Sequence, residues 1–134
     1  MRWVIRIVGG AAGKPEVDDV KMVPSGMRKL VLSCKLPAGW QVGEWRYLQP
    51  ESYELILVSR ANSLMQDFDK RFVVSWDPPT ATYRLILPRA ANTSDSGLYI
   101  CYSGAGPAAT RLRAINLLVP SQTRFAYQIT NIPE

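Results

Sequence analysis

Few residues of this chain belong to the types that carry out covalent or metal chemistry. The 134 residues include no histidine and only two cysteines, Cys34 and Cys101. Catalysis by a Ser-His-Asp or Cys-His arrangement is thereby excluded, and two cysteines alone cannot complete a tetrahedral zinc site. The cysteines lie 67 positions apart, so they are not a C-x-x-C redox or metal pair either. They are either two unrelated buried thiols or the two halves of one long-range disulfide.

Two other short motifs suggest chemistry that their own residues rule out. GGAAGKP, at residues 9–15, resembles a phosphate-binding loop, but Val8 stands where its first glycine should be and Pro15 replaces the Ser or Thr. Asp18 and Asp19 are adjacent carboxylates, and neighbours on a strand point to opposite faces, so paired acid–base catalysis is not expected. We therefore predict no catalytic residue, no cofactor and no metal ion, and we assign the chain no enzymatic activity.

The charge balance leaves more than one class of partner open. Sixteen Lys and Arg against eleven Asp and Glu give a net charge of +5 and a pI of about 9.5. Such an excess could attract an anionic ligand such as a sulfated glycan. The basic residues are nevertheless spread along the chain, and no run of them exceeds two. We interpret the excess mainly as an aid to solubility and expect no nucleic-acid partner.

The elements that must position these residues are short β-strands. Helical patterns are scarce: residues 62–68 could form a single helical turn, and a loop with partly buried residues explains them equally well. Eight or nine short strands, separated by turn residues at close intervals, predict an all-β sandwich or barrel. The expected strands are residues 2–8, 28–36, 43–50, 53–59, 70–76, 82–88, 98–103 and 111–119.

The residues before Cys101 form the most specific pattern in the chain. In NTSDSGLYICYSG, residues 92–104, four characteristic residues occupy every second position: Asp95, Gly97, Tyr99 and Cys101. Two residues is the period of a β-strand, whose alternate side chains share one face. Tyr99 and Cys101 should therefore face the same core, with Gly97 at the turn that enters the strand.

A second cysteine and a tryptophan complete the pattern earlier in the chain. Cys34 lies in an alternating segment, and Trp45 follows eleven positions later in the next expected strand. This Cys…Trp…Cys order, together with WRYLQP, ELILVSRANS, RF, YRLIL and DSGLYIC, resembles an immunoglobulin domain of the variable (V-set) type. The resemblance covers about residues 20–119. We expect residues 1–120 to form this domain and residues 121–134 to be an extension, a linker or the start of a following segment.

The resemblance implies how the two sheets are held together. Cys34 and Cys101 would form a disulfide between them, and Trp45 would pack against the sulfur atoms. The Tyr99 hydroxyl would bond to the backbone at the corner before its strand. An ion pair across one end of the sandwich is expected for two further residues, Arg71 and Asp95.

One segment departs from the antigen receptors of this family. Their last strand carries a Gly-x-Gly bulge after a long loop, whereas GAG at residues 104–106 follows Cys101 by only three residues. Glycine tolerates positive φ, so we interpret GAG as the turn of the hairpin between the last two strands. The chain is therefore not expected to be a rearranging antigen receptor.

The resemblance also implies recognition through the outer face of the G-F-C-C′ sheet or through the loops at one end. Alternation predicts which side chains point outward if Trp45 and Cys101 point inward and if Leu55 and Leu57 are core residues. An apolar and aromatic centre with arginines at its rim is typical of a protein interface. The predicted face comprises Arg46, Leu48, Ile56, Ile100 and Tyr102, flanked by Arg111 and Arg113.

These inferences favour an extracellular recognition or adhesion domain, secreted or displayed at a cell surface. We expect it to bind another immunoglobulin-type domain or a second copy of itself; a module for an anionic ligand is the alternative. No apolar run approaches the ~20 residues that cross a bilayer, so any membrane attachment would lie outside this chain. Asn92-Thr93-Ser94 fits the N-glycosylation sequon, which makes Asn92 the expected glycosylation site.

Overall fold

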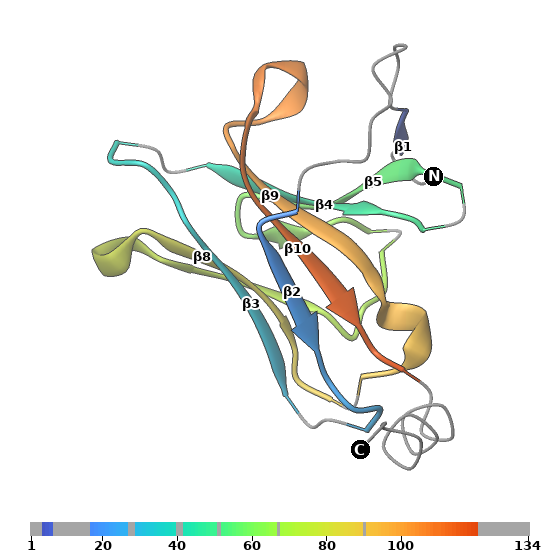
Figure 1. Cartoon of the computed structure of the whole chain (residues 1–134). Coiled ribbons are helices and arrows are strands. Elements are labelled where there is room, and N and C mark those ends of the chain that lie inside the picture. The colour runs from blue at the N-terminus through green and yellow to red at the C-terminus, as the bar shows by residue number, and fades with distance from the viewer. Residues whose placement is uncertain are drawn as a thin grey trace.

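Two β-sheets lie face to face and enclose one main core (Figure 1). In the described part, ten strands are joined by loops and three short 3-10 helices, and no helix there is long and apolar enough to cross a membrane. The expected extension, residues 121–134, lies outside the described residues. The computed structural model describes residues 17–26, 29–39, 42–50, 52–66, 68–89 and 91–120, together with the backbone of residues 4–6.

The larger sheet has seven strands, six of them in the order β1-β5-β4-β9-β10-β2, with β6 pairing with β5. All its neighbours are antiparallel except β10 and β2, which run parallel. Bulges interrupt the pairing of β4 with β5 and of β10 with β9. The strands are β1 Val4–Arg6, β2 Asp19–Met22, β4 Gly43–Leu48, β5 Glu54–Arg60, β6 Ser63–Leu64, β9 Gly97–Ser103 and β10 Thr110–Leu118.

The smaller sheet has three antiparallel strands in the order β3-β8-β7. Alternate residues of β3 and β8 are buried, as the period of two predicts for strands with one face on the core. The strands are β3 Leu30–Lys35, β7 Val73–Asp77 and β8 Thr82–Leu87, and the 3-10 helices are η1 Pro78–Thr80, η2 Thr93–Asp95 and η3 Gly106–Ala108.

Two segments differ from their sequence-based expectation. Residues 62–68, which the sequence left as either a helical turn or a loop, contain the short strand β6 at Ser63–Leu64. The strand β2 was not among the strands expected from the sequence. The strand exists because its residues pair in parallel with β10, a distant segment; the ion pairs of Asp18 with Arg111 and of Asp19 with Arg113 lie at the same edge.

A disulfide joins the two sheets through the middle of the core, as expected. The Sγ atoms of Cys34 in β3 and Cys101 in β9 are 2.05 Å apart, and their Cα atoms are 6.3 Å apart. Trp45 in β4 is fully buried in the same cluster, and its ring stacks at 6.1 Å from that of Tyr83 in β8. Each sheet therefore contributes one cysteine and one large aromatic ring to the centre of the core.

Two tyrosine hydroxyls hold the corner before β9 by donating hydrogen bonds to backbone carbonyl groups. The Tyr99 hydroxyl donates to the carbonyl oxygen of Asp95 at 2.7 Å, and the Tyr47 hydroxyl donates to that of Ser96 at 2.6 Å. The Asp95 carboxylate is buried and accepts from Arg71 Nη2 at 2.7 Å. Both hydroxyls and this ion pair thus fix the same turn.

Gly97 should be irreplaceable at this corner. Its φ of +147° disfavours other residues, and a Cβ there would lie 2.4 Å from Cε1 of the Tyr47 ring. We expect Gly97→Ala to lower the free energy of unfolding by about 3–4 kcal/mol, through strain and overpacking together. The matched control is Gly39→Ala, where φ is +88° but no atom lies within 4 Å, with an expected loss of about 1–2 kcal/mol. Equal losses in urea unfolding would contradict the packing argument.

Alkaline pH should unfold the chain through its buried tyrosines. Burial raises the pKa of Tyr83 from 10.0 to about 12, and it raises the pKa of Tyr99 well above its usual value. The unfolded chain therefore loses these protons first, and stability that is complete below pH 10 should fall as the pH rises toward 12. The expected slope is about 1.4 kcal/mol per pH unit for each tyrosine. Urea unfolding at several pH values measures it, and an unchanged slope in Tyr83→Phe would refute the assignment.

Candidate functional site

The outer face of the larger sheet carries an apolar cluster of its own, separate from the disulfide core. Leu48, Leu98, Ile100 and Ala114 belong to it, and Tyr102 packs against it while remaining partly exposed. Leu48 and Ile100 do lie on this face, but the expectation that they form an exposed patch is wrong, since each is only 4% exposed. The apolar character of the face was therefore predictable, and its burial was not.

Ile56 lies on the opposite side of the sheet from the one expected. It lines an inner cavity together with Tyr47 and Tyr99, whereas Leu55 belongs to the outer cluster. Almost every residue of β5 is buried, so apolar character could not reveal which set faces the core. The pairing of Tyr47 with Ile56, which follows the bulge at Val58 of β5, sets which side of the sheet Ile56 faces.

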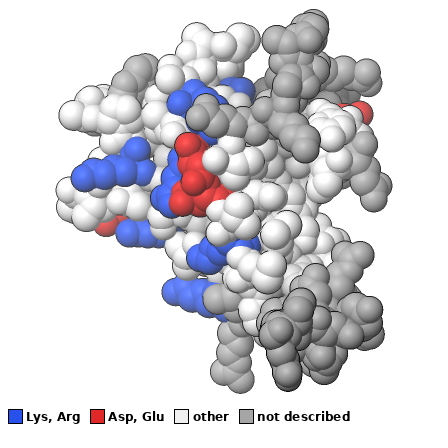
Figure 2. All heavy atoms as spheres, viewed as in Figure 1, with Lys and Arg blue, Asp and Glu red and all other residues white. Residues whose placement is uncertain are grey.

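The predicted arginine rim is tied to carboxylates. Arg111 Nη2 lies 2.9 Å from Asp18 Oδ2, and Arg113 Nε lies 2.6 Å from Asp19 Oδ2. Arg113 also donates to the Ser33 carbonyl of β3, so its side chain points toward the smaller sheet and not across the outer face. The bulge between the two arginines changes the alternation that the sequence suggested. Near the middle of its view, Figure 2 shows acidic side chains with basic ones beside them.

A buried carboxylate that the sequence analysis overlooked lies on the same face. Glu44 is fully buried and accepts from Nε and Nη2 of Arg46, at 3.0 and 2.7 Å, and from Nε of Arg60. The backbone N–H of Gly106 also donates to Glu44, and Arg46 donates to the Gly106 carbonyl. Arg46, one of the predicted outward residues, is itself buried, and its guanidinium carbon lies 3.9 Å from the centre of the Tyr102 ring.

This cluster fastens the hairpin between β9 and β10 to β4. Buried charges are costly unless they are paired and hydrogen-bonded, and here one carboxylate serves two guanidinium groups and one amide. Nothing in the spacing of Glu44, Arg46 and Arg60 marks them as a set, because the contacts depend on β4 and β5 being neighbours and on the fold of the hairpin. The only sign of the cluster in the sequence was that Glu44 and Arg46, two residues apart on one strand, carry opposite charges.

Solvent-exposed apolar side chains of the outer face gather at its β2 edge. Val20 and Met22 are 64% and 55% exposed, and they pair with Asn116 and Leu118 of β10. Ala114 of the outer cluster sets the alternation in β10, which places Asn116 and Leu118 on the outer face. A groove of about 470 Å³ adjoins this edge; its lining is Met22, Pro50, Ser96, Gly97, Asn116, Leu118, Val119 and Pro120.

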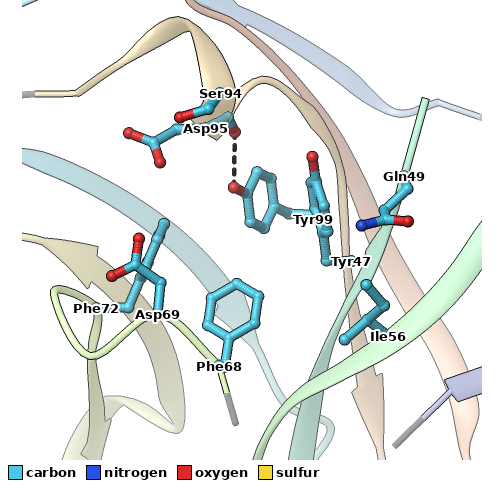
Figure 3. Close-up of a pocket in the computed structure, with 9 residues that line it drawn as sticks. All are labelled: Tyr47, Gln49, Ile56, Phe68, Asp69, Phe72, Ser94, Asp95 and Tyr99. Carbon is cyan, nitrogen blue, oxygen red and sulfur yellow. Dashed lines mark hydrogen bonds between the residues drawn. The ribbon is translucent and has the colours of Figure 1, made fainter. Parts of the chain in front are cut away.

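A smaller cavity of about 250 Å³ opens between the sheets at the Tyr99 corner. Figure 3 shows Phe68, Tyr47 and Tyr99 around this space, with the bond from Tyr99 to Asp95 beside it. Arg71 bonds to Asp95 and also to Asp69, and hydrogen bonds from Arg71 lower the pKa of Asp69. These carboxylates are engaged in the turn, and the described residues contain no group of acidic or cysteine side chains that could hold a metal ion.

Comparison with known proteins identifies the fold of this chain but assigns it to no family. No family model matches the sequence, and no curated protein matches it. Among solved structures, one chain of the crystal structure of the ZIG-8–RIG-5 IG1–IG1 heterodimer superposes with a TM-score of 0.59. The match covers 84% of this chain and 90% of that chain, at 21% sequence identity.

The chain has an immunoglobulin-like β-sandwich fold. An identity of 21% supports the fold alone. Matches of this kind extend to 1911 solved chains, so the fold by itself selects no partner.

Glu44 should contribute far more to stability than Arg60, its partly exposed partner. We expect Glu44→Gln to lower the free energy of unfolding by about 3 kcal/mol, because it leaves the buried charge of Arg46 uncompensated. Arg60→Gln is the control, since that side chain is 47% exposed and its loss should cost about 0–1 kcal/mol. Hydrogen exchange at the Gly106 amide should quicken in Glu44→Gln. Equal effects of the two substitutions in chemical unfolding would contradict the account.

Proposed function

We propose that this chain is a variable-type immunoglobulin domain that recognises another protein through the outer face of its larger sheet. The partner is another immunoglobulin-type domain or a second copy of the chain. Strands β5 and β6 beyond β4 support the variable type, which adds strands at this edge. The disulfide supports an oxidising, extracellular setting, either secreted or at a cell surface.

The apolar β2 edge is the observation that carries this proposal. Val20 and Met22 present aliphatic side chains to solvent beside a groove that Leu118 and Pro50 also line. Contiguous exposed apolar surface with a polar border is typical of protein interaction sites. The buried outer cluster lies next to this strip in the same sheet, since Leu98 pairs with Asn116.

A rigid hairpin at the other end of the face favours the same function. The Glu44 cluster fixes both the N–H and the carbonyl of Gly106, so the hairpin tip is ordered before any partner arrives. Preorganisation of this kind reduces the entropy that binding must overcome. Ala105, Pro107 and Ala108 are exposed at that tip and offer contacts of low conformational entropy.

The ion pairs weigh against the anionic-ligand alternative. Arg111, Arg113 and Arg60 each have a carboxylate partner within the chain. An anionic ligand would have to compete with those carboxylates for the guanidinium groups. The count of sixteen Lys and Arg therefore overstates the positive charge that this face offers to an anionic ligand.

A binding screen with charge substitutions tests the proposal. The multimerised full chain is applied to a panel of extracellular immunoglobulin-type domains that includes the chain itself. We expect at least one panel member to bind the wild type and to lose affinity at least about tenfold with Val20→Asp or Met22→Asp, because a buried unpaired carboxylate is costly.

Val73→Asp is the matched control for this screen. Val73 is 48% exposed on β7, at the edge of the smaller sheet, so its substitution should leave binding unchanged. The proposal is wrong if no panel member binds, or if the Val20 and Met22 variants bind as the wild type does. Binding that disappears in about 1 M NaCl would instead support an anionic ligand.

A further inference from the structure

The turn between β8 and β9 presents three consecutive exposed residues to solvent. They are Asn92, Thr93 and Ser94, the last two within the 3-10 helix η2. Asn92 has an extended backbone, with φ −115° and ψ 161°, so the chain bends only after it. This tripeptide is the single Asn-x-Ser/Thr sequence in the chain. The acceptor amide and the hydroxyl two residues later therefore lie in one exposed turn.

The buried side of the same turn is held by a capping box between Asn92 and Asp95 and by backbone hydrogen bonds. Asp95 Oδ2 accepts from the Asn92 backbone N–H at 2.7 Å, and the Asp95 N–H donates to the Asn92 carbonyl at 2.9 Å. The Ser96 N–H donates to the Thr93 carbonyl, and Arg71 binds the other Asp95 oxygen. The capping box uses the Asn92 side chain as an acceptor, through its Oδ1 atom, and the other bonds come from the backbone and from Asp95. A group attached to the Nδ2 atom therefore leaves these contacts in place.

The surface beside the turn has room for a sugar. A hollow of about 320 Å³ adjoins it, and its lining includes Thr93, Ser94, Ser96, Pro50 and Ser52. Hydroxyl groups can hydrogen-bond to sugar hydroxyls, and the proline offers an apolar surface to sugar C–H groups. The lining also includes Tyr47 and Gln49.

We propose that Asn92 carries an N-linked oligosaccharide, an inference that rests on the extracellular setting of the proposed function. The donor is a lipid-linked oligosaccharyl diphosphate. The Asn92 Nδ2 atom forms a bond to the anomeric carbon of the first sugar, the bond from that carbon to the diphosphate oxygen breaks, and Nδ2 loses one proton. The lipid diphosphate leaves with the electron pair, and nothing is oxidised or reduced.

The position of the turn gives the glycan a structural consequence. In Figure 1 the turn before β9 lies at the same end of the sandwich as the end of β10, and the hairpin between β9 and β10 lies at the opposite end. The paired residues Met22 and Leu118 end β2 and β10 here, and Pro50 and Ser96 line both the hollow beside the turn and the groove at the β2 edge. A bulky, hydrated glycan would therefore flank that groove and limit the directions from which a protein partner can approach it.

Mass analysis of the full chain, expressed behind a secretion leader in cultured animal cells, tests the site. Total tagged protein is recovered, so failure of secretion cannot hide the result. We expect one glycan on the wild type, released by peptide N-glycosidase and mapped to Asn92. Asn92→Gln and Ser94→Ala should both lack it. Thr93→Ala is the matched control, because it alters an exposed neighbour, keeps the sequon and should be glycosylated.

Each outcome decides the proposal. An unmodified wild type with its disulfide formed would overturn it, as would a glycan that persists in Ser94→Ala. Either result would leave the protein-binding proposal standing, since the panel screen reads the β2 edge and not the turn. Conversely, a glycosylated chain that binds no panel member would overturn the binding proposal alone.

Discussion

The covalent link between Cys34 and Cys101 is the constraint on which the other features of the sandwich depend. It fixes the separation of the two sheets and makes one face of β9 the inner face. Closing a loop of this length stabilises the fold by roughly 4 kcal/mol in the chain-entropy model. With Cys101 inward, Ile100 and Tyr102 must point outward, and the pairing of β9 with β4 and β10 extends that choice across the sheet.

The outer face combines two ways of stabilising groups on an exposed sheet. At the hairpin end, Glu44 compensates Arg46 and Arg60 and binds the Gly106 backbone. At the β2 edge, aliphatic side chains remain in solvent. The charged cluster orders the hairpin without exposing apolar surface. The β2 edge leaves apolar surface in solvent, which a partner can bury. This division explains why the recognition surface is assigned to the β2 edge and the ordered hairpin, and not to the buried centre of the face.

Sequence reasoning succeeded in β3, where one face is polar, and failed in β5, where both faces are buried. The alternation in β3 and the spacing of Tyr99 and Cys101 predicted side chains that face the core, and the disulfide itself was implied by the resemblance to variable-type immunoglobulin domains. In β5 the apolar run is nearly continuous, so Ile56 was placed on the wrong side. The Glu44 cluster and the pairing of β2 with β10 depend on contacts between distant segments, which no local pattern encodes. Bulges at Trp45–Arg46 and Arg111–Arg113 added phase changes that strict alternation cannot supply.

Peptide mapping of the oxidised chain tests the central claim most directly. Proteolysis without reduction, followed by mass spectrometry, should yield one linked pair of peptides that contain Cys34 and Cys101, and reduction should separate them. Alkylation before reduction should find no reactive thiol. Recovery of both cysteines as free thiols from oxidised, folded protein would contradict the account, because neither the inner face of β9 nor the recognition surface opposite it would then be fixed.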